Sequence, residues 1–250
     1  MALHYDMKIP IIFHMNNNFR DENAFIEEMR GKSGMRTLLP ESVIVEETTA
    51  DVSEDVLLPE EQAVIAGAVP KRRLEFATVR SCARRALAQL GYPPSPILPG
   101  PGREPLWPPG IVGSLTHCEG YRAAAVATTR DFISLGIDAE VNEMLPDNVL
   151  PFITTENELK MFSALKNENK CIMWDRVIFS AKESIYKAWY CLTHRWLDFK
   201  DCEVNVNPIT SQFSGRILVH APSSIKGVLE RFSGSWSADD THVYTAITCI

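Results

Sequence analysis

Two carboxylates placed two residues apart, Asp138 and Glu140, are the first candidates for chemistry in this sequence. They end a segment in which Ile133, Leu135 and Ile137 alternate with small or polar residues, a pattern typical of a strand. On a strand both carboxylates lie on the same face with their Cα atoms about 6.6–6.8 Å apart, so both can bind one hard divalent cation. Most such pairs are solvated strand ends, and the pair alone leaves both interpretations open.

A second group of candidates lies on the helix predicted over residues 174–192, where apolar residues recur at intervals of three and four. The opposite side of that helix carries four aligned polar residues, Arg176, Ser180, Glu183 and Lys187. This side is either a solvated face with a surface ion pair worth about 0.3–0.5 kcal/mol, or it brings a third carboxylate and a cation to the Asp138–Glu140 pair.

Basic residues gather on the helix predicted over residues 71–90, although the whole chain has a net charge of −7. Arg73, Arg80 and Arg84 share one face of that helix because they are seven and eleven residues apart. Arginine binds phosphate through two parallel hydrogen bonds, so this face suits an anion with several phosphates. The alternative is an exposed helix whose charges serve solubility.

A fourth candidate is the segment 113–118, in which Ser114, Thr116 and His117 supply two hydroxyls and an imidazole. The imidazole could bind a ligand or move a proton. A lone histidine is more often a structural hydrogen-bonding group. The segment therefore indicates a functional site only together with the other three groups.

The elements that must position these residues alternate irregularly along the chain. Residues 92–113 are rich in proline and glycine and predict a loop, and Thr155 with Glu158 forms a capping box that begins a helix. Strands are predicted over residues 43–45, 121–128, 132–140, 202–206, 216–220, 233–237 and 242–247, and further helices over 59–68, 71–90 and 174–192. Because strands and helices do not alternate as βαβ units, we expect an α+β fold.

Composition excludes several classes of protein. The chain has 250 residues, 45% hydrophobic and 23% charged, which is typical of a folded globular protein. A net charge of −7 argues against duplex nucleic acid as a partner. The six cysteines include no C-x-x-C pair and predict reduced thiols, and the first residues form neither a signal peptide nor a membrane span. We therefore expect a cytoplasmic protein without a membrane partner.

Five sequence motifs together resemble one enzyme family. In chain order they are Lys71–Phe76, Arg103–Pro108, Gly113–His117, Gly136–Glu140 and Ser180–Trp189. They look like the motifs of 4′-phosphopantetheinyl transferases of the surfactin and enterobactin type, close to the actinobacterial branch. The resemblance covers about residues 36–250 and leaves the N-terminal extension 1–35 without a role.

The resemblance implies a pseudo-dimer of two similar α+β lobes, residues 36–132 and 133–250, with coenzyme A and Mg²⁺ in the cleft between them. Mn²⁺ could replace Mg²⁺, and the protein is expected to be a monomer. The implied metal ligands are Asp138, Glu140 and Glu183. The implied ligands of coenzyme A are Lys182 and Lys187 near the diphosphate, and Arg73, Arg80, Thr116 and His117 around the nucleotide phosphates. Relatives often carry a lysine in the loop before Arg103, and this sequence does not, so that phosphate contact is either missing or made by Arg103.

The reaction implied is transfer of 4′-phosphopantetheine from coenzyme A to a serine of apo acyl or peptidyl carrier proteins. Glu183 would be the catalytic base, and Lys187 would neutralise or protonate the leaving phosphate. Two alternatives remain: a divalent-metal diphosphatase acting on coenzyme A, and a non-catalytic module that binds coenzyme A or a carrier. Tyr190, Arg195 and Trp196 are the candidates for docking a carrier, because this aromatic and basic group at the end of the helix and in the segment after it adjoins Glu183 and Lys187.

Overall fold

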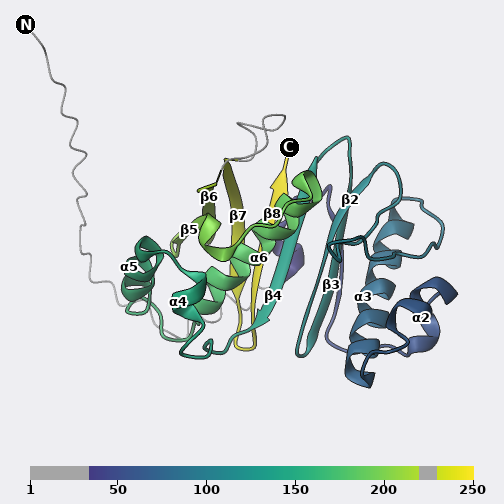
Figure 1. Ribbon diagram of the computed structural model, residues 1–250, viewed down its shortest axis with the longest axis horizontal. Helices are drawn as coiled ribbons and strands as arrows, with labels where there is room; N and C mark the ends of the chain where they lie inside the picture. The colour runs from purple at the N-terminus through teal and green to yellow at the C-terminus, as the bar shows by residue number, and fades with distance from the viewer. Residues whose placement is uncertain (1–33, 220–229) are drawn as a thin grey trace, which may run out of the picture.

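The computed structural model describes residues 34–219 and 230–250, so most of the extension 1–35 lies outside the described part of the chain. Two antiparallel sheets lie next to each other, each covered by helices (Figure 1). The three-stranded sheet has the order β1-β3-β2 and the five-stranded sheet the order β4-β8-β7-β6-β5. The predicted α+β class is confirmed.

The first sheet consists of β1 (Ile44–Thr48), β2 (Ile111–Cys118) and β3 (Tyr121–Thr128). Strand β3 is central and buried on both faces. Its alternate residues serve two cores: Ala124 and Val126 pack with α3 (Pro70–Gln89), whereas Ala123 and Ala125 face the second sheet. Small alanine side chains let a helix and a sheet approach the same strand closely. Helix α2 (Pro59–Ile65) lies outside α3 (Figure 1).

The second sheet is covered on one face by the long helix α6 (Trp174–Thr193), whose apolar stripe forms the larger core with the strands. Its strands are β4 (Ser134–Val141), β5 (Cys202–Asn207), β6 (Gln212–Ile217), β7 (Arg231–Ala238) and β8 (His242–Cys249). The strand predicted over 216–220 is misplaced, because the structure begins it at Gln212, and residue 220 lies outside the described residues. Three short elements, η1 (Met35–Leu38), η2 (Glu54–Val56) and η3 (Phe199–Asp201), and helix α4 (Leu150–Ile153) were not predicted.

Helix α5 (Glu156–Leu165) protects the free edge of β5. The predicted capping box is confirmed: the Thr155 hydroxyl accepts from the Glu158 amide, and the Glu158 carboxylate accepts from the Thr155 amide. The second oxygen of Glu158 accepts from the Val204 amide of β5 at 2.6 Å. This side chain therefore occupies an edge donor that would otherwise be free to pair with another strand.

The two sheets meet along a seam between β2 and β4, each of which is an edge strand of its own sheet. The backbone amides of Ile137 and Ala139 donate to side-chain hydroxyls of β2, Ser114 Oγ at 3.1 Å and Thr116 Oγ1 at 3.0 Å. Both partners advance by two residues in the same chain direction, so the two strands run parallel. Hydroxyls thus take the place of the carbonyl acceptors that a continuous sheet would supply.

An apolar core lies beside the seam and contains residues of both sheets, among them Ala125, Ile137 and Tyr244, together with Met35 of η1. The predicted boundary between residues 132 and 133 lies in the connection from β3 to β4. The division into two similar lobes stays a prediction.

Two further observations concern the described residues alone. None of the helices in ranges 34–219 and 230–250 combines the length and apolar character needed to cross a membrane. All six cysteines fall within these ranges and are free thiols. The cytoplasmic location and the monomeric state stay predictions.

Ser114→Ala tests the seam. The variant removes the acceptor of the buried Ile137 amide, and an unpaired buried donor costs about 1–3 kcal/mol. We expect the free energy of unfolding, measured in urea by tryptophan fluorescence, to fall by about that amount. Ser233→Ala, on the exposed face of β7, is the control and should change it by less than about 0.5 kcal/mol. Equal losses in the two variants would contradict a special role for the seam.

Candidate active site

Helix α6 lies directly on strand β4 because β4 carries glycine at position 136. A Cβ at Gly136 would lie 1.9 Å from the Ser184 carbonyl oxygen, so any larger residue would push the helix away. The close approach brings Glu183 and Lys187 of α6 to the part of β4 that carries Asp138. Glycine at this point is thus a condition for the site.

The polar residues of α6 contact strands β4 and β8 at the end of the second sheet next to the seam, which decides between the two interpretations left open by the sequence. Arg176 NH1 donates to Glu140 Oε2 at 3.1 Å, and Lys187 Nζ donates to Asp138 Oδ1 at 2.7 Å. Ser180 is fully buried and exchanges a hydrogen bond with Thr245 of β8. The interpretation of this side as a solvated face is wrong.

Asp138 is the most constrained of the carboxylates. It is buried, and its Oδ1 accepts from Lys187 and, at 3.3 Å, from the Thr116 hydroxyl. Its Oδ2 is buried and has no hydrogen-bond partner among the described residues. Lys187 also donates to the Ile137 carbonyl at 2.9 Å, which leaves one of its three N–H groups without a hydrogen bond to the described residues. A buried carboxylate oxygen without a donor is an unfavourable arrangement unless a cation or proton completes it.

The other two carboxylates, Glu140 and Glu183, have raised pKa values. Burial, followed by the charge of Asp138, raises the pKa of Glu140 to about 7. Burial and then Asp138 also raise the pKa of Glu183. We call Asp138, Glu140 and Glu183 the carboxylate cluster. Their mutual repulsion is the kind of perturbation that marks functional sites more often than surfaces.

The donor set of the carboxylate cluster fits a hard divalent cation, because it offers only carboxylate oxygens and one of them lacks a partner. The side chains do not converge on a single point: within residues 34–219 and 230–250, no three acidic, cysteine or histidine side chains are close enough together to hold a metal ion. Glu140 is instead paired with Arg176. The chemistry of the site fits Mg²⁺, and a metal role for these residues stays a proposal.

Thr116 contributes to the carboxylate cluster through its hydroxyl, which bridges the Ala139 amide and Asp138. The sequence placed Thr116 around the nucleotide phosphates. Its described hydrogen bonds direct the hydroxyl to Asp138, and a phosphate contact stays a prediction.

His117, at the end of β2, lies among charged residues of α3. Its Nε2 is 3.7 Å from Glu75 Oε2, and Arg72 NH1 is 3.4 Å from the same oxygen. Burial, then the charge of Arg72, lowers the pKa of His117, and the more distant Lys187 acts in the same direction. Arg72 was missed by the sequence analysis, which selected Arg73 because it aligns better with Arg80 on an ideal helix. Only the position of β2 beside the first turn of α3 identifies Arg72.

The other arginines predicted to bind phosphate have protein partners. Arg73 Nε donates to Glu54 of η2 at 2.6 Å, and Arg84 NH1 donates to the fully buried Glu61. Arg80 is buried, donates from Nε to the Ile97 carbonyl at 2.8 Å, and has a pKa lowered to about 10, chiefly by burial. The arginines of the predicted common face therefore already bind protein groups. Arg80 as a phosphate ligand stays a prediction, and Arg72 is a better candidate than Arg73.

Lys182 is far less available than the sequence suggested. It is buried, and its ammonium donates to Glu158 Oε2 at 2.8 Å, to the Phe199 carbonyl at 2.6 Å and to the Cys202 carbonyl at 2.8 Å. These bonds use all three of its donors. Lys182 therefore joins α6 to α5 and β5, and we remove it from the residues expected to contact the diphosphate.

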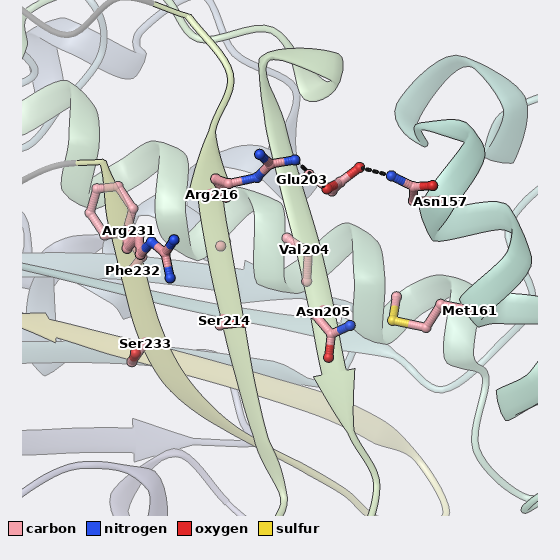
Figure 2. Close-up of a pocket in the computed structure, with 11 residues that line it drawn as sticks. Asn157, Met161, Glu203, Val204, Asn205, Ser214, Arg216, Arg231, Phe232 and Ser233 are labelled. Carbon is pink, nitrogen blue, oxygen red and sulfur yellow. Dashed lines mark hydrogen bonds and ion pairs between the residues drawn. The ribbon is translucent and has the colours of Figure 1, made fainter. Parts of the chain in front are cut away.

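A cavity of about 510 Å³ lies elsewhere, on the outer face of β5, β6 and β7 beside α5 (Figure 2). Glu203 forms its polar centre, since it accepts from Arg216 at 2.9 Å and from Asn157 at 2.9 Å. None of the residues predicted for chemistry lines this cavity. We therefore place the candidate active site at the seam between β2 and β4.

Comparisons with known proteins agree with the resemblance in the sequence. Residues 60–127 match the family model of the 4′-phosphopantetheinyl transferase N-terminal domain, and residues 134–241 match that of the 4′-phosphopantetheinyl transferase superfamily. The chain is 48% identical over 213 residues to the 4′-phosphopantetheinyl transferase Svp of Streptomyces mobaraensis, covering 84% of this chain and 87% of the relative. It is 43% identical over 219 residues to the 4′-phosphopantetheinyl transferase PptT of Mycobacterium tuberculosis, covering 84% and 96%.

A more distant similarity covers about half of the chain. Enterobactin synthase component D of Salmonella typhi is 31% identical over 121 residues, which is 48% of this chain and 49% of the relative. The actinobacterial relatives therefore match much more of the sequence than the enterobactin-type ones do.

Lys182→Met tests the structural assignment of this lysine. Removing one partner of a buried ion pair leaves Glu158 charged and uncompensated, which costs about 3–5 kcal/mol. We expect the free energy of unfolding to fall by that order. The double variant Lys182→Met/Glu158→Gln, which leaves no unpaired charge, should recover part of the loss. A Lys182→Met variant of unchanged stability would contradict the assignment.

Proposed function

The chain belongs to the 4′-phosphopantetheinyl transferase superfamily, and we propose that its transfer reaction takes place at the carboxylate cluster on the β2–β4 seam. As a member of this family it uses coenzyme A to convert apo carrier proteins to their holo form. The observation that carries the location is the buried Oδ2 of Asp138, which lies beside Lys187 and has no hydrogen-bond partner in the described part of the chain. The two alternatives, a diphosphatase and a non-catalytic binding module, find no support among the relatives, which are named as transferases.

The proposed reaction begins with attack of the carrier serine oxygen on the β-phosphorus of coenzyme A. The bond from that phosphorus to the oxygen bridging the two phosphates breaks. The phosphopantetheine group is then attached to the serine, and adenosine 3′,5′-bisphosphate leaves with the bridging oxygen. The serine proton must be accepted by a nearby base, and the leaving phosphate gains negative charge.

Glu183 is the proposed base. It is half-buried, and its pKa is raised by burial and by Asp138. A carboxylate with a raised pKa accepts a proton near neutral pH more readily than an ordinary glutamate. Its position on α6, one turn before Lys187, places the base and a cation on the same side of the helix.

Lys187 is proposed to face the leaving phosphate. Its bonds to Asp138 and to the Ile137 carbonyl fix the ammonium at the seam, and its remaining N–H can donate to a phosphate oxygen. Asp138, Glu140 and Glu183 are the residues that would hold Mg²⁺. When bound, Mg²⁺ or Mn²⁺ would stabilise negative charge on the diphosphate.

The carrier is proposed to dock beside the end of α6. Trp196 is 73% exposed, and its ring contacts Tyr186 at 5.2 Å between centroids, so it offers a fixed apolar surface. Arg195 directly precedes Trp196 on the same exposed stretch and can meet an acidic carrier surface.

Asp138→Asn and Glu183→Gln should each reduce transfer at least about 100-fold, because each removes a negative charge from the reaction centre while preserving side-chain size. The measurement is the mass increase of an apo carrier incubated with coenzyme A and Mg²⁺. Glu143→Gln is the matched control, since this carboxylate lies on the same segment and has no described contact with the cluster. Near wild-type turnover in either cluster variant would contradict the proposed site.

Arg72→Ala and His117→Ala should raise the KM for coenzyme A about tenfold with little change in kcat, as expected when a ground-state phosphate contact is lost. Dephospho-coenzyme A, which lacks the 3′-phosphate, is the test ligand. If these residues bind that phosphate, their variants should match the wild type with the analogue. Arg73→Ala is the matched comparison and should have a smaller effect, because Glu54 already holds its guanidinium. An equal loss with both ligands would exclude a 3′-phosphate role.

The rise in Tm on addition of Mg²⁺ should depend on pH through Glu140, whose pKa burial raises to about 7. The unfolded carboxyl loses its proton near its ordinary pKa of about 4.5, so stability without metal falls as pH rises between these values. Metal binding needs the ionised carboxylate. Added Mg²⁺ should therefore raise Tm more at about pH 8 than at about pH 6. Equal Tm shifts at both pH values, measured without coenzyme A, would contradict a ligand role for Glu140.

A further inference from the structure

The segment from Leu98 to Leu106 forms a tight loop between α3 and β2. The Leu106 amide donates to the Leu98 carbonyl at 2.8 Å, and the Gly100 amide donates to the Glu104 carbonyl at 2.7 Å. The Arg103 amide donates to the Gly100 carbonyl at 2.9 Å, and the Glu104 carboxylate accepts from the Gly102 amide at 2.9 Å. These bonds define one conformation for the loop and place Arg103 at its tip.

Arg103 has a φ of 69°, in the left-handed region that favours glycine. This backbone conformation costs a residue with a side chain about 1–2 kcal/mol relative to the right-handed helical conformation. Gly100 and Gly102, the neighbouring glycines, do not have positive φ. Glycine would relieve the strain at position 103, but an exposed arginine occupies that position. Strain that the local sequence does not relieve motivates a search for the function of that side chain.

The loop reaches across to the second sheet's helix at Gly102. A Cβ at Gly102 would lie 2.1 Å from both Cζ and Oη of Tyr190, so the tyrosine ring lies directly against the glycine backbone. Because Gly102 has no positive φ, its backbone does not require glycine, but any side chain at this position would have to displace the end of the Tyr190 ring.

Tyr190 belongs to the same side of α6 as the proposed catalytic residues, seven residues after Glu183 and three after Lys187. Its ring is held by neighbouring aromatic residues: the centroids of Tyr186 and Tyr190 are 5.8 Å apart, and so are those of Tyr190 and His194. The loop therefore rests on a rigid surface at the end of the helix that carries the active site.

We propose that Tyr190 is a positioning residue that holds the Arg103 loop beside the active site through its contact with Gly102. This inference rests on the proposed function and on the expectation, implied by the family resemblance, that Arg103 binds a phosphate of coenzyme A. Without the Tyr190 ring, the strained loop can adopt other conformations. The free energy needed to order the loop again then weakens binding of coenzyme A. The contact also joins the first sheet's loop to the second sheet's helix, so that phosphate ligand and catalytic groups keep one geometry.

Gly102→Ala provides the first test, because a methyl group there must displace the Tyr190 ring or the loop. We expect the KM for coenzyme A to rise about tenfold and kcat to change less than about twofold. Isothermal titration with coenzyme A should show the same loss of affinity. Gly67→Ala is the matched control, since a Cβ at Gly67 meets nothing within 4 Å, and it should leave both constants unchanged.

Tyr190 variants give the second test. Tyr190→Ala should raise the KM for coenzyme A as Gly102→Ala does. Tyr190→Phe, which keeps the ring, should have a KM near that of the wild type. Combining Gly102→Ala with Tyr190→Ala should be no worse than Tyr190→Ala alone, because the clash disappears with the ring. In an Arg103→Ala background, Tyr190→Ala should have no further effect on KM.

Three results would overturn the proposal: an unchanged KM in Gly102→Ala, additive effects of the two substitutions, or a full effect of Tyr190→Ala in the Arg103→Ala background. Failure of the proposed function would look different. In that case the wild-type chain itself would give no holo carrier in the mass assay.

Discussion

The seam between β2 and β4 is the interaction on which the rest of the structure depends. Two sheets that each end in an open edge are joined there by the hydroxyls of Ser114 and Thr116, which accept the amides of Ile137 and Ala139. Side-chain acceptors satisfy the buried donors of β4 without merging the sheets. The same Thr116 hydroxyl contacts Asp138, so the joint between the sheets and the candidate active site share an atom.

Charge is concentrated at this joint at the expense of local stability. Among the described residues, Asp138 keeps a buried oxygen without a partner, and Glu140 and Glu183 have raised pKa values. Lys182, by contrast, is fully paired, with Glu158 and with the Phe199 and Cys202 carbonyls. The contrast separates groups that hold the fold from groups available to a substrate or an ion.

Patterns with a strong local cause could be predicted from the sequence. The periodicity of residues 174–192 predicted α6 almost to the residue, and Thr155 with Glu158 predicted the start of α5. The segment 113–118 was not predicted as a strand, because glycine, hydroxyl residues and histidine lack the apolar alternation of a typical strand. Its strand conformation follows from its place between β3 and β4, which a local pattern does not contain.

The sequence by itself determined the family, the fold class and the residue types of the site, since motifs and periodicity are local properties of the chain. Only the tertiary structure decided which of these residues meet. It directed Lys182 into an ion pair with α5, brought Arg72 rather than Arg73 to His117, and placed Tyr190 against Gly102. The physical reason is that Gly136 lets α6 approach β4, and this long-range contact sets which side of α6 faces the seam.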